Sequence, residues 1–217
     1  MKTKFLMLLF GLLVIPSYAQ KNNVYLNDDL VKISETEYST TNNSPEYFNI
    51  HFELDTSFVH VKVQRIKKGK ISQKQFNALK SELAEISGTS IPDKNVILIN
   101  YYHGQDACNA TIKQVKPVYK KFLRKLKKVE NVSQIFMYKS LKGAEEYSKN
   151  FNWINDRYST IENTFLPLHY PCGSYVMIDN EGNYFVHKGE YNIFRIIEFL
   201  HDQKNTFDQT KSARLIP

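Results

Sequence analysis

Two early segments of the chain alternate apolar and polar residues, at positions 47–54 and 58–66. A period of two is typical of strands with one buried face, so both segments are predicted to be strands. Residues 35–45 are rich in Ser, Thr and Asn, and residues 67–70 hold three lysines and a glycine, so we expect a loop and a turn there. We expect these two strands to form an N-terminal β extension that pairs with the edge of a main sheet.

A helix is expected after this extension, because apolar residues recur at helical spacing between positions 76 and 86. Ser72 is suited to the N-cap position, and Gln75, three residues later, completes a capping-box pattern. Gly88 is a suitable C-terminal stop for the helix. The extension and this helix together are assigned to residues 20–90.

From residue 96 onward the pattern predicts the order strand, helix, strand, helix, strand, strand, helix. Residues 96–99 are continuously apolar, which is typical of a central strand buried on both faces. Pro117 lies inside the first of these helices and is expected to kink it. The residues after Lys204 are polar, so residues 205–217 are expected to form a frayed tail. The expected elements are strands at 96–99 and 132–138, helices at 112–126, 143–153 and 193–200, and a hairpin of strands 175–178 and 184–187.

The first nineteen residues have the pattern of a secretory signal peptide. Lys2 and Lys4 precede an apolar run over residues 5–15, and Pro16 and Ala19 mark the expected cleavage region. The apolar run is short for a membrane span, which takes about 20 residues, although an uncleaved N-terminal anchor is the alternative. We therefore expect an exported protein, periplasmic or extracellular.

The formal net charge is +7, and residues 113–128 hold eight Lys or Arg and no acidic residue. Such a run is typical either of a solvated helix face or of a surface that contacts anionic lipid or nucleic acid. Nucleic acid is not an expected partner for an exported chain. A solvated face is the plainer interpretation, with a weak anionic surface contact as the alternative.

The chain has two cysteines, Cys108 and Cys172, which are 64 positions apart. An oxidising compartment permits a lasting disulfide, and an even count fits one bridge. The alternative is two unpaired core residues, because free cysteine is among the most buried residue types. The residues alone leave both open.

Residues 96–201 resemble the thioredoxin-like superfamily, and within it the exported redoxin-type branch. The resemblance is carried by the strand and helix order, by Pro117, and by the hairpin segment 176–189, where an apolar strand ends in Asp179 and a Gly-containing turn. It implies an α/β fold, a thioredoxin-like three-layer sandwich over residues 91–204 that carries the N-terminal β extension.

Two departures from that family's pattern concern its active site. Active members carry a Cys-x-x-Cys pair after the first of these strands, whereas residues 102–111 hold Cys108 alone. The family's cis-proline position falls on Gly173, and whether the bond before Pro171 is cis stays open. The resemblance also implies that the segment holding Cys172 lies against the turn holding Cys108, and from this we predict a bond between them.

If the pair is redox-active, Cys108 is the expected attacking thiol and Cys172 its resolving partner. The expected helix start beside Cys108 would stabilise a thiolate, and His103 would assist if the turn folds back, whereas a plain turn role is its alternative. Asp106 would oppose the thiolate by its charge.

A metal site of His103, Cys108, His169 and Cys172 is a weaker alternative, because typical zinc-ligand spacings are absent. No phosphate-binding loop, nucleophile elbow or H-E-x-x-H pattern occurs in the sequence. No metal or other cofactor is therefore expected.

Two functional hypotheses follow. The first is an exported thioredoxin-like protein that exchanges thiols and disulfides with protein thiols through Cys108 and Cys172. The second is a non-catalytic binding or assembly module with a structural disulfide or free buried thiols. The oligomeric state is not predicted.

Overall fold

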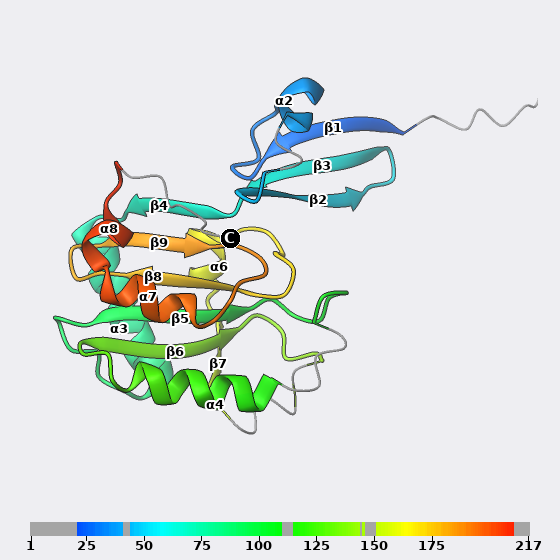
Figure 1. Cartoon of the computed structure of the whole chain (residues 1–217). Coiled ribbons are helices and arrows are strands. Elements are labelled where there is room, and N and C mark those ends of the chain that lie inside the picture. The colour runs from blue at the N-terminus through cyan, green and yellow to red at the C-terminus, as the bar shows by residue number, and fades with distance from the viewer. Residues whose placement is uncertain (1–20, 41–43, 110–114, 144, 146–150, 211–217) are drawn as a thin grey trace, which may run out of the picture. The chain divides into compact units, whose positions relative to one another are not determined.

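The computed structural model describes residues 21–40, 44–109, 115–143, 145 and 151–210 (Figure 1). The chain divides into two compact units. Among the described residues, the smaller unit comprises residues 21–40 and 49–62, and the larger one comprises residues 44–48 and those from 63 to 210. The predicted signal peptide lies outside the described residues. None of the helices in the described ranges is long and apolar enough to cross a membrane.

The larger unit is built on a six-stranded sheet with the order β4-β9-β8-β5-β6-β7. The central strand β5 pairs in parallel with β6 and antiparallel with β8, and β8 and β9 form the predicted hairpin. Edge strand β4 pairs with β9, and edge strand β7 pairs with β6. The strands are β4 Ile66–Lys70, β5 Val96–Tyr102, β6 Val132–Tyr138, β7 Trp153–Asn155, β8 Ser174–Ile178 and β9 Asn183–His187.

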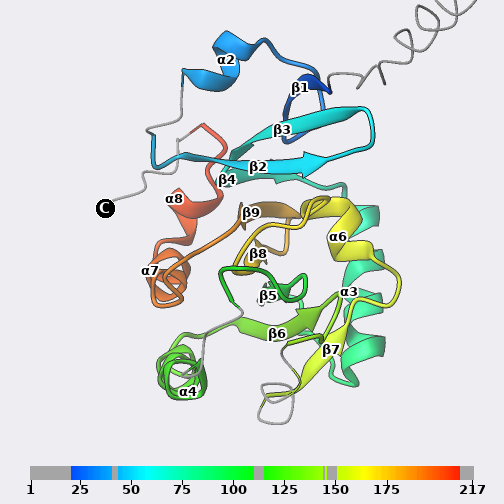
Figure 2. The same cartoon turned by 90° about the vertical axis from the view of Figure 1, so that its right-hand side faces the viewer.

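Helices cover both faces of this sheet, which gives three layers (Figure 2). Helices α3 and α6 lie on one face, and α4 and α7 lie on the other. The second face is packed by one apolar cluster to which the sheet, α4 and α7 all contribute. The predicted three-layer α/β sandwich is confirmed. The helices are α3 Gln73–Ser87, α4 Val115–Leu126, α6 Thr160–Phe165, α7 Arg195–His201 and α8 Gln203–Phe207.

Helix α3 begins and ends as its sequence predicts. The Ser72 hydroxyl accepts the Gln75 backbone N–H at 3.3 Å, and the Gln75 side chain accepts the Ser72 backbone N–H at 2.9 Å. Gly88 follows the helix with φ of 65°, a left-handed conformation that costs glycine little. Both ends of α3 are therefore capped.

The smaller unit carries a three-stranded sheet of order β1-β3-β2. Its elements are β1 Asn22–Asn27, α2 Glu35–Ser39 and most of β2 Tyr47–Glu53 and β3 Ser57–Gln64. The prediction of a loop over residues 35–45 is wrong at its start, where α2 forms. The Ser34 hydroxyl caps this short helix by accepting the Glu37 backbone N–H, and Tyr38 buries its ring.

The prediction of a turn at residues 67–70 is also wrong, because β4 occupies them. Gly69 lies opposite Tyr184 of β9, and the Tyr184 ring fills the space where a Cβ at Gly69 would stand. Lysines are common on edge strands because they discourage pairing with further chains. The expectation that the strands at 47–54 and 58–66 pair with the main sheet is wrong, because β2 and β3 pair within the separate three-stranded sheet and β4 extends the main sheet instead.

The remaining differences concern short elements. Trp153 begins β7 rather than ending a helix, and most of the helix expected at 143–153 lies outside the described residues. Helix α6 was not predicted. The chain does not fray directly after Lys204, because α8 continues to Phe207, whose ring joins the core. Pro117 is in the first described turn of α4, and the residues before Val115, on which a kink depends, are not described.

Candidate redox site

The topology brings the two cysteines together at one end of the central strand. Strands β5 and β8 are antiparallel, so Tyr101 near the end of β5 lies opposite Ser174 at the start of β8. Cys108 follows β5 in a turn at residues 107–109, and Cys172 lies two residues before β8. The loop after β5 and the loop before β8 therefore meet at the same end of these two strands.

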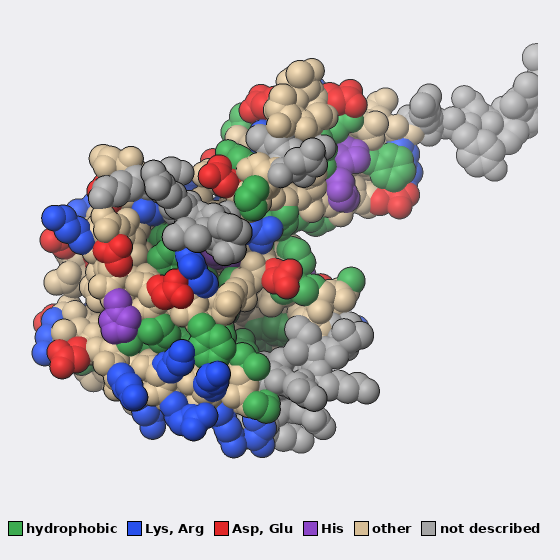
Figure 3. Space-filling model, in the orientation of Figure 1, with side chains coloured by type: hydrophobic (Ala, Val, Ile, Leu, Met, Phe, Trp, Pro, Cys, Tyr) green, Lys and Arg blue, Asp and Glu red, His purple; other side chains and the backbone are tan. Residues whose placement is uncertain are grey.

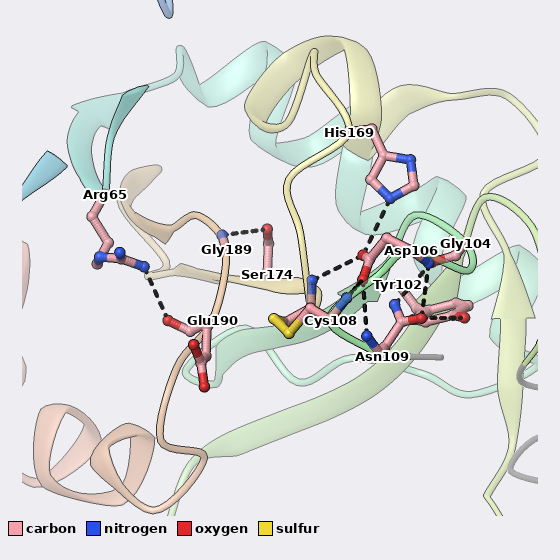
Figure 4. The surroundings of a disulfide bond; sticks show 11 residues. Arg65, Tyr102, Gly104, Asp106, Cys108, Asn109, His169, Ser174, Gly189 and Glu190 are labelled. Atoms are coloured by element: carbon pink, nitrogen blue, oxygen red, sulfur yellow. Dashed lines mark hydrogen bonds and ion pairs between the residues drawn. A yellow bond between two sulfur atoms is a disulfide. The ribbon is translucent and has the colours of Figure 1, made fainter. Parts of the chain in front are cut away.

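Cys108 and Cys172 form a disulfide, with 5.2 Å between their Cα atoms (Figure 4). This distance lies within the ordinary range for the bond. Both residues are partly exposed rather than buried. The predicted pairing is confirmed, and it places a solvent-accessible disulfide where the resemblance implies the active site.

The backbone that presents Cys172 is unusual. Cys172 has φ of 69° and Gly173 has φ of 105°, so two consecutive residues lie in the left-handed region. A Cβ at Gly173 would stand 3.1 Å from the Tyr101 carbonyl oxygen. Proline, whose φ is fixed near −65°, cannot take this conformation, so the position where the family has its cis-proline requires glycine here. The Tyr170–Pro171 bond is trans.

The Asp106 carboxylate joins the two cysteine loops (Figure 4). Its Oδ1 accepts the backbone N–H groups of Cys108 at 2.8 Å and of Asn109 at 2.9 Å. Its Oδ2 accepts the backbone N–H of Cys172 at 2.9 Å and lies 3.4 Å from the Nε2 atom of His169. One carboxylate is thus bonded to the backbone of both cysteines.

Asn109 closes the same turn from the other side. Its Oδ1 accepts the Asp106 backbone N–H at 2.9 Å, and its Nδ2 donates to the Gly104 carbonyl at 3.0 Å. Neither Asn109 nor the Asp106 link to Cys172 was predicted. Asp and Asn three residues apart around Cys108 are typical turn-forming residues, and this was the one available signal.

His103 lies in the core beneath the site. Its side chain is 4% exposed, and its Nε2 lies 3.3 Å from the Leu166 carbonyl oxygen. Its ring stacks on the His169 ring and meets the Tyr101 ring edge-on. Burial lowers the pKa of His103 to about 4, so the ring is neutral at pH 7 and brings no positive charge to Cys108.

A buried hydrogen bond supports the end of β5. The Tyr101 hydroxyl donates to Asp156 Oδ2 at 2.9 Å, and the Asp156 carboxylate also accepts the backbone N–H groups of Ile161 and Glu162. These two N–H groups belong to the first turn of α6, where a negative charge is favourable. Burial, followed by the Asp156 charge, raises the pKa of Tyr101 far above its usual value, so this hydroxyl remains protonated and donating.

Two sequence-based expectations about Cys108 have different outcomes. The predicted helix start beside it falls on residues 110–114, which lie outside the described residues. Asp106, which we expected to oppose a thiolate by its charge, does stand next to both cysteines.

Within the described part of the chain, no three or more His, Cys, Asp and Glu side chains are placed to hold a metal ion together.

The predicted basic run lies on α4 and the turn after it. Figure 3 shows Lys and Arg side chains gathered over this helix. Lys121 and Lys125 stand over the Phe194 ring, at 5.5 and 5.2 Å from its centroid. The described members are all exposed: Lys116, Lys120, Lys121, Arg124, Lys125, Lys127 and Lys128. Whether they contact an anionic surface stays a prediction.

No family model matches the sequence, and neither does any curated protein. Solved structures similar to this one include the N-terminal domain of PilB from Neisseria gonorrhoeae, at 12% identity and TM-score 0.42, covering 62% of this chain and 99% of that one. The mitochondrial 2-Cys peroxiredoxin of Plasmodium falciparum shows 8% identity and TM-score 0.40, covering 77% and 96%. The exposed lipoprotein thioredoxin Etrx1 of Streptococcus pneumoniae shows 10% identity and TM-score 0.37, covering 72% and 98%.

The fold is thioredoxin-like, as the order of its strands and helices shows. The strand order, the antiparallel β8–β9 hairpin and the helices on both faces of the sheet (Figure 2) are those that the resemblance implies.

Proposed function

We propose that this chain is an exported thioredoxin-like protein that exchanges disulfides with protein thiols through Cys108 and Cys172. The observation that carries the proposal is the partly exposed disulfide between the loop after β5 and the loop before β8. Both loops lie at the same end of the central strands β5 and β8. Exposed disulfides have higher reduction potentials than buried structural ones and are more readily opened.

The electrons and protons of this exchange balance without a further cofactor. In the reduced chain, the Cys108 thiolate attacks one sulfur of a substrate disulfide, which forms a mixed disulfide and releases the first substrate thiolate. The Cys172 thiolate then attacks Cys108 Sγ in the mixed disulfide and releases the second substrate thiolate. Both released thiolates take up protons, the substrate gains two electrons, and the chain returns to its disulfide. A dithiol donor restores the reduced chain by the same steps.

The test combines a redox titration with trapping of the mixed disulfide. We expect the mature protein, equilibrated with glutathione buffers, to show a potential above about −300 mV. With a model protein disulfide as substrate, Cys172→Ser should accumulate a mixed disulfide at Cys108, because the resolving thiol is missing. Cys108→Ser is the matched control and should accumulate much less. A potential below about −300 mV, or no mixed disulfide in either variant, contradicts the proposal.

A second candidate is a non-catalytic binding or assembly module with a structural disulfide. Asp106 favours it, because a carboxylate bonded to both cysteine loops stabilises the closed pair and repels a thiolate. This candidate predicts a disulfide that glutathione does not open and that forms no mixed disulfide with protein thiols. The same titration therefore separates the two candidates.

Export is part of the proposal and has its own test. The pattern of residues 1–19 supports it. We expect the mature chain to begin near Gln20 and to be recovered from the periplasm or the medium. A full-length chain that retains residues 1–19 in the cytosol would contradict export without bearing on the redox chemistry.

A further inference from the structure

The Asp106 carboxylate is placed to act on both cysteines at once. Its side chain is 15% exposed, and it receives three backbone N–H groups, one of which comes from a loop 66 residues further along the chain. A carboxylate that accepts several backbone N–H groups holds its donors firmly, because hydrogen bonds to a charged acceptor are strong. Two of the three donors are the backbone N–H groups of Cys108 and Cys172.

We propose that Asp106 is a positioning residue that holds the Cys172 loop against Cys108 and so favours the closed disulfide over the open dithiol. The proposal deepens the proposed function and rests on it in one respect, namely that the disulfide opens. It concerns the equilibrium between the two forms rather than the identity of the substrate.

The first reason is proximity. The bond from the Cys172 N–H to Asp106 involves no sulfur atom, so reduction of the disulfide does not remove it. Together with the stacking of the His103 ring on the His169 ring, it joins the two loops in the dithiol form as well. Two thiols held side by side close to a disulfide more readily than two thiols on separated loops, because less conformational entropy is lost.

The second reason is charge, and it acts in the same direction. A thiolate at Cys108 or Cys172 is stabilised by nearby N–H groups and destabilised by a nearby carboxylate. Asp106 occupies the backbone N–H groups of both cysteines and adds its own negative charge beside them. His169 Nε2, at 3.4 Å from Asp106 Oδ2, is on a side chain that is 44% exposed, so solvent weakens its contact with the carboxylate.

The experiment compares Asp106→Asn with a matched control, Asp179→Asn. Asp179 makes the same kind of turn in the β8–β9 hairpin, where its Oδ1 accepts the backbone N–H groups of Glu181 and Asn183, each at 2.9 Å. An asparagine keeps an oxygen for the local turn at either place. At residue 106 it loses the charge, and its amide group cannot accept the Cys172 N–H.

We expect Asp106→Asn to lower the equilibrium constant for disulfide closure by about tenfold, which is about 30 mV for this two-electron couple. Asp179→Asn should leave it unchanged. In the reduced proteins, the rate of iodoacetamide alkylation should rise at lower pH for Asp106→Asn than for the wild type, because the thiolates are no longer repelled. A merely structural role would not shift that pH profile.

Asp106→Ser serves as a second variant, because the serine hydroxyl supports the local turn but does not reach Cys172. This variant should shift the equilibrium in the same direction.

Hydrogen exchange of the Cys172 amide in the reduced wild type is a test that needs no variant. That amide should be protected, and rapid exchange would overturn the proposal whatever the variants do.

Equal closure constants for Asp106→Asn and Asp179→Asn would also overturn it, even if the wild type exchanges disulfides as proposed. The proposed function can also fail while the positioning role of Asp106 holds. If dithiothreitol titration shows the tenfold shift while no mixed disulfide forms with protein thiols, Asp106 positions the pair and the proposed function fails.

Discussion

Two buried histidines make the stability of this chain sensitive to acid. His103, beneath the disulfide, is 4% exposed, and His187, at the end of β9, is 5% exposed. Burial is the main cause that lowers the pKa of His103 to about 4 and that of His187 to about 3. For His187 the nearby Arg65 charge acts in the same direction.

The direction of the effect follows from proton binding. An unfolded histidine has a pKa of about 6.5, so below that pH the unfolded chain binds protons that the folded chain excludes. The free energy of unfolding therefore falls as the pH decreases from about 6.5 toward the folded pKa values, and it is fully retained above about pH 7. The relevant window is pH 6.5 to 4 for His103 and pH 6.5 to 3 for His187.

The magnitude at pH 4.5 is large for a domain of this size. With the pKa values of about 4 and about 3, each histidine lowers the free energy of unfolding by about 2.5 kcal/mol relative to pH 7.5. Together they remove about 5 kcal/mol, when the total stability of a domain is about 5–15 kcal/mol. We therefore expect substantial destabilisation at a pH where most carboxylates are still ionised.

The assay is urea unfolding of the oxidised protein at a series of pH values between 7.5 and 4.5. His103→Gln and His187→Gln should each reduce the pH-dependent loss by about 2.5 kcal/mol, because glutamine does not titrate. His201→Gln, at the exposed end of α7, is the matched control and should leave the loss unchanged. The reasoning is refuted if the wild type is equally stable across this range, or if the two buried variants lose as much as the control.

Three further predictions concern stability. Reduction of the Cys108–Cys172 bond, which closes a loop of 64 residues, should lower the free energy of unfolding by about 4 kcal/mol in urea titrations, and equal stability of both forms would contradict a bridged native state. Asp156→Ala should cost about 3 kcal/mol by calorimetry, because the Tyr101 hydroxyl loses its buried acceptor and α6 loses its cap; a cost below about 1 kcal/mol would contradict this account. Ser72→Ala should cost about 1 kcal/mol in urea unfolding, and no change would mean that the capping box contributes nothing.

The elements that were predicted correctly are those in which the positions of the apolar residues directly reflect which faces are buried. The apolar run at residues 96–99 marks β5 because both faces of a central strand are covered. The apolar residues between 76 and 86 mark α3 because one face of that helix is buried, and Ser72 and Gly88 mark its ends. In each case the signal is local and repeated along the element.

The elements that were missed have no such pattern. Strand β4 is an edge strand in which only three lysines and Gly69 follow Ile66, so it shows no alternation of apolar and polar residues. Helices α2 and α6 have 5 and 6 residues, too few to show a period of 3.6.

The pairing of Cys108 with Cys172 was predicted from a family resemblance, because nothing in the spacing of the residues indicates contact across 64 positions. The role of Asp106 depends on the conformation of two loops, including the left-handed backbone at Cys172. A single sequence carries no signal for that conformation at a residue other than glycine. The site was therefore predictable in its location and not in its hydrogen bonding.

The disulfide also sets the covalent connectivity of the molecule. It ties Cys108 to Cys172 around a stretch that contains α4, β6, β7 and α6. A protease that cuts once anywhere within this stretch leaves two pieces that remain a single covalent molecule. On a gel the cut chain would run as two fragments only after reduction. In an oxidising compartment, one proteolytic cut within the loop would therefore not release either half of the sheet.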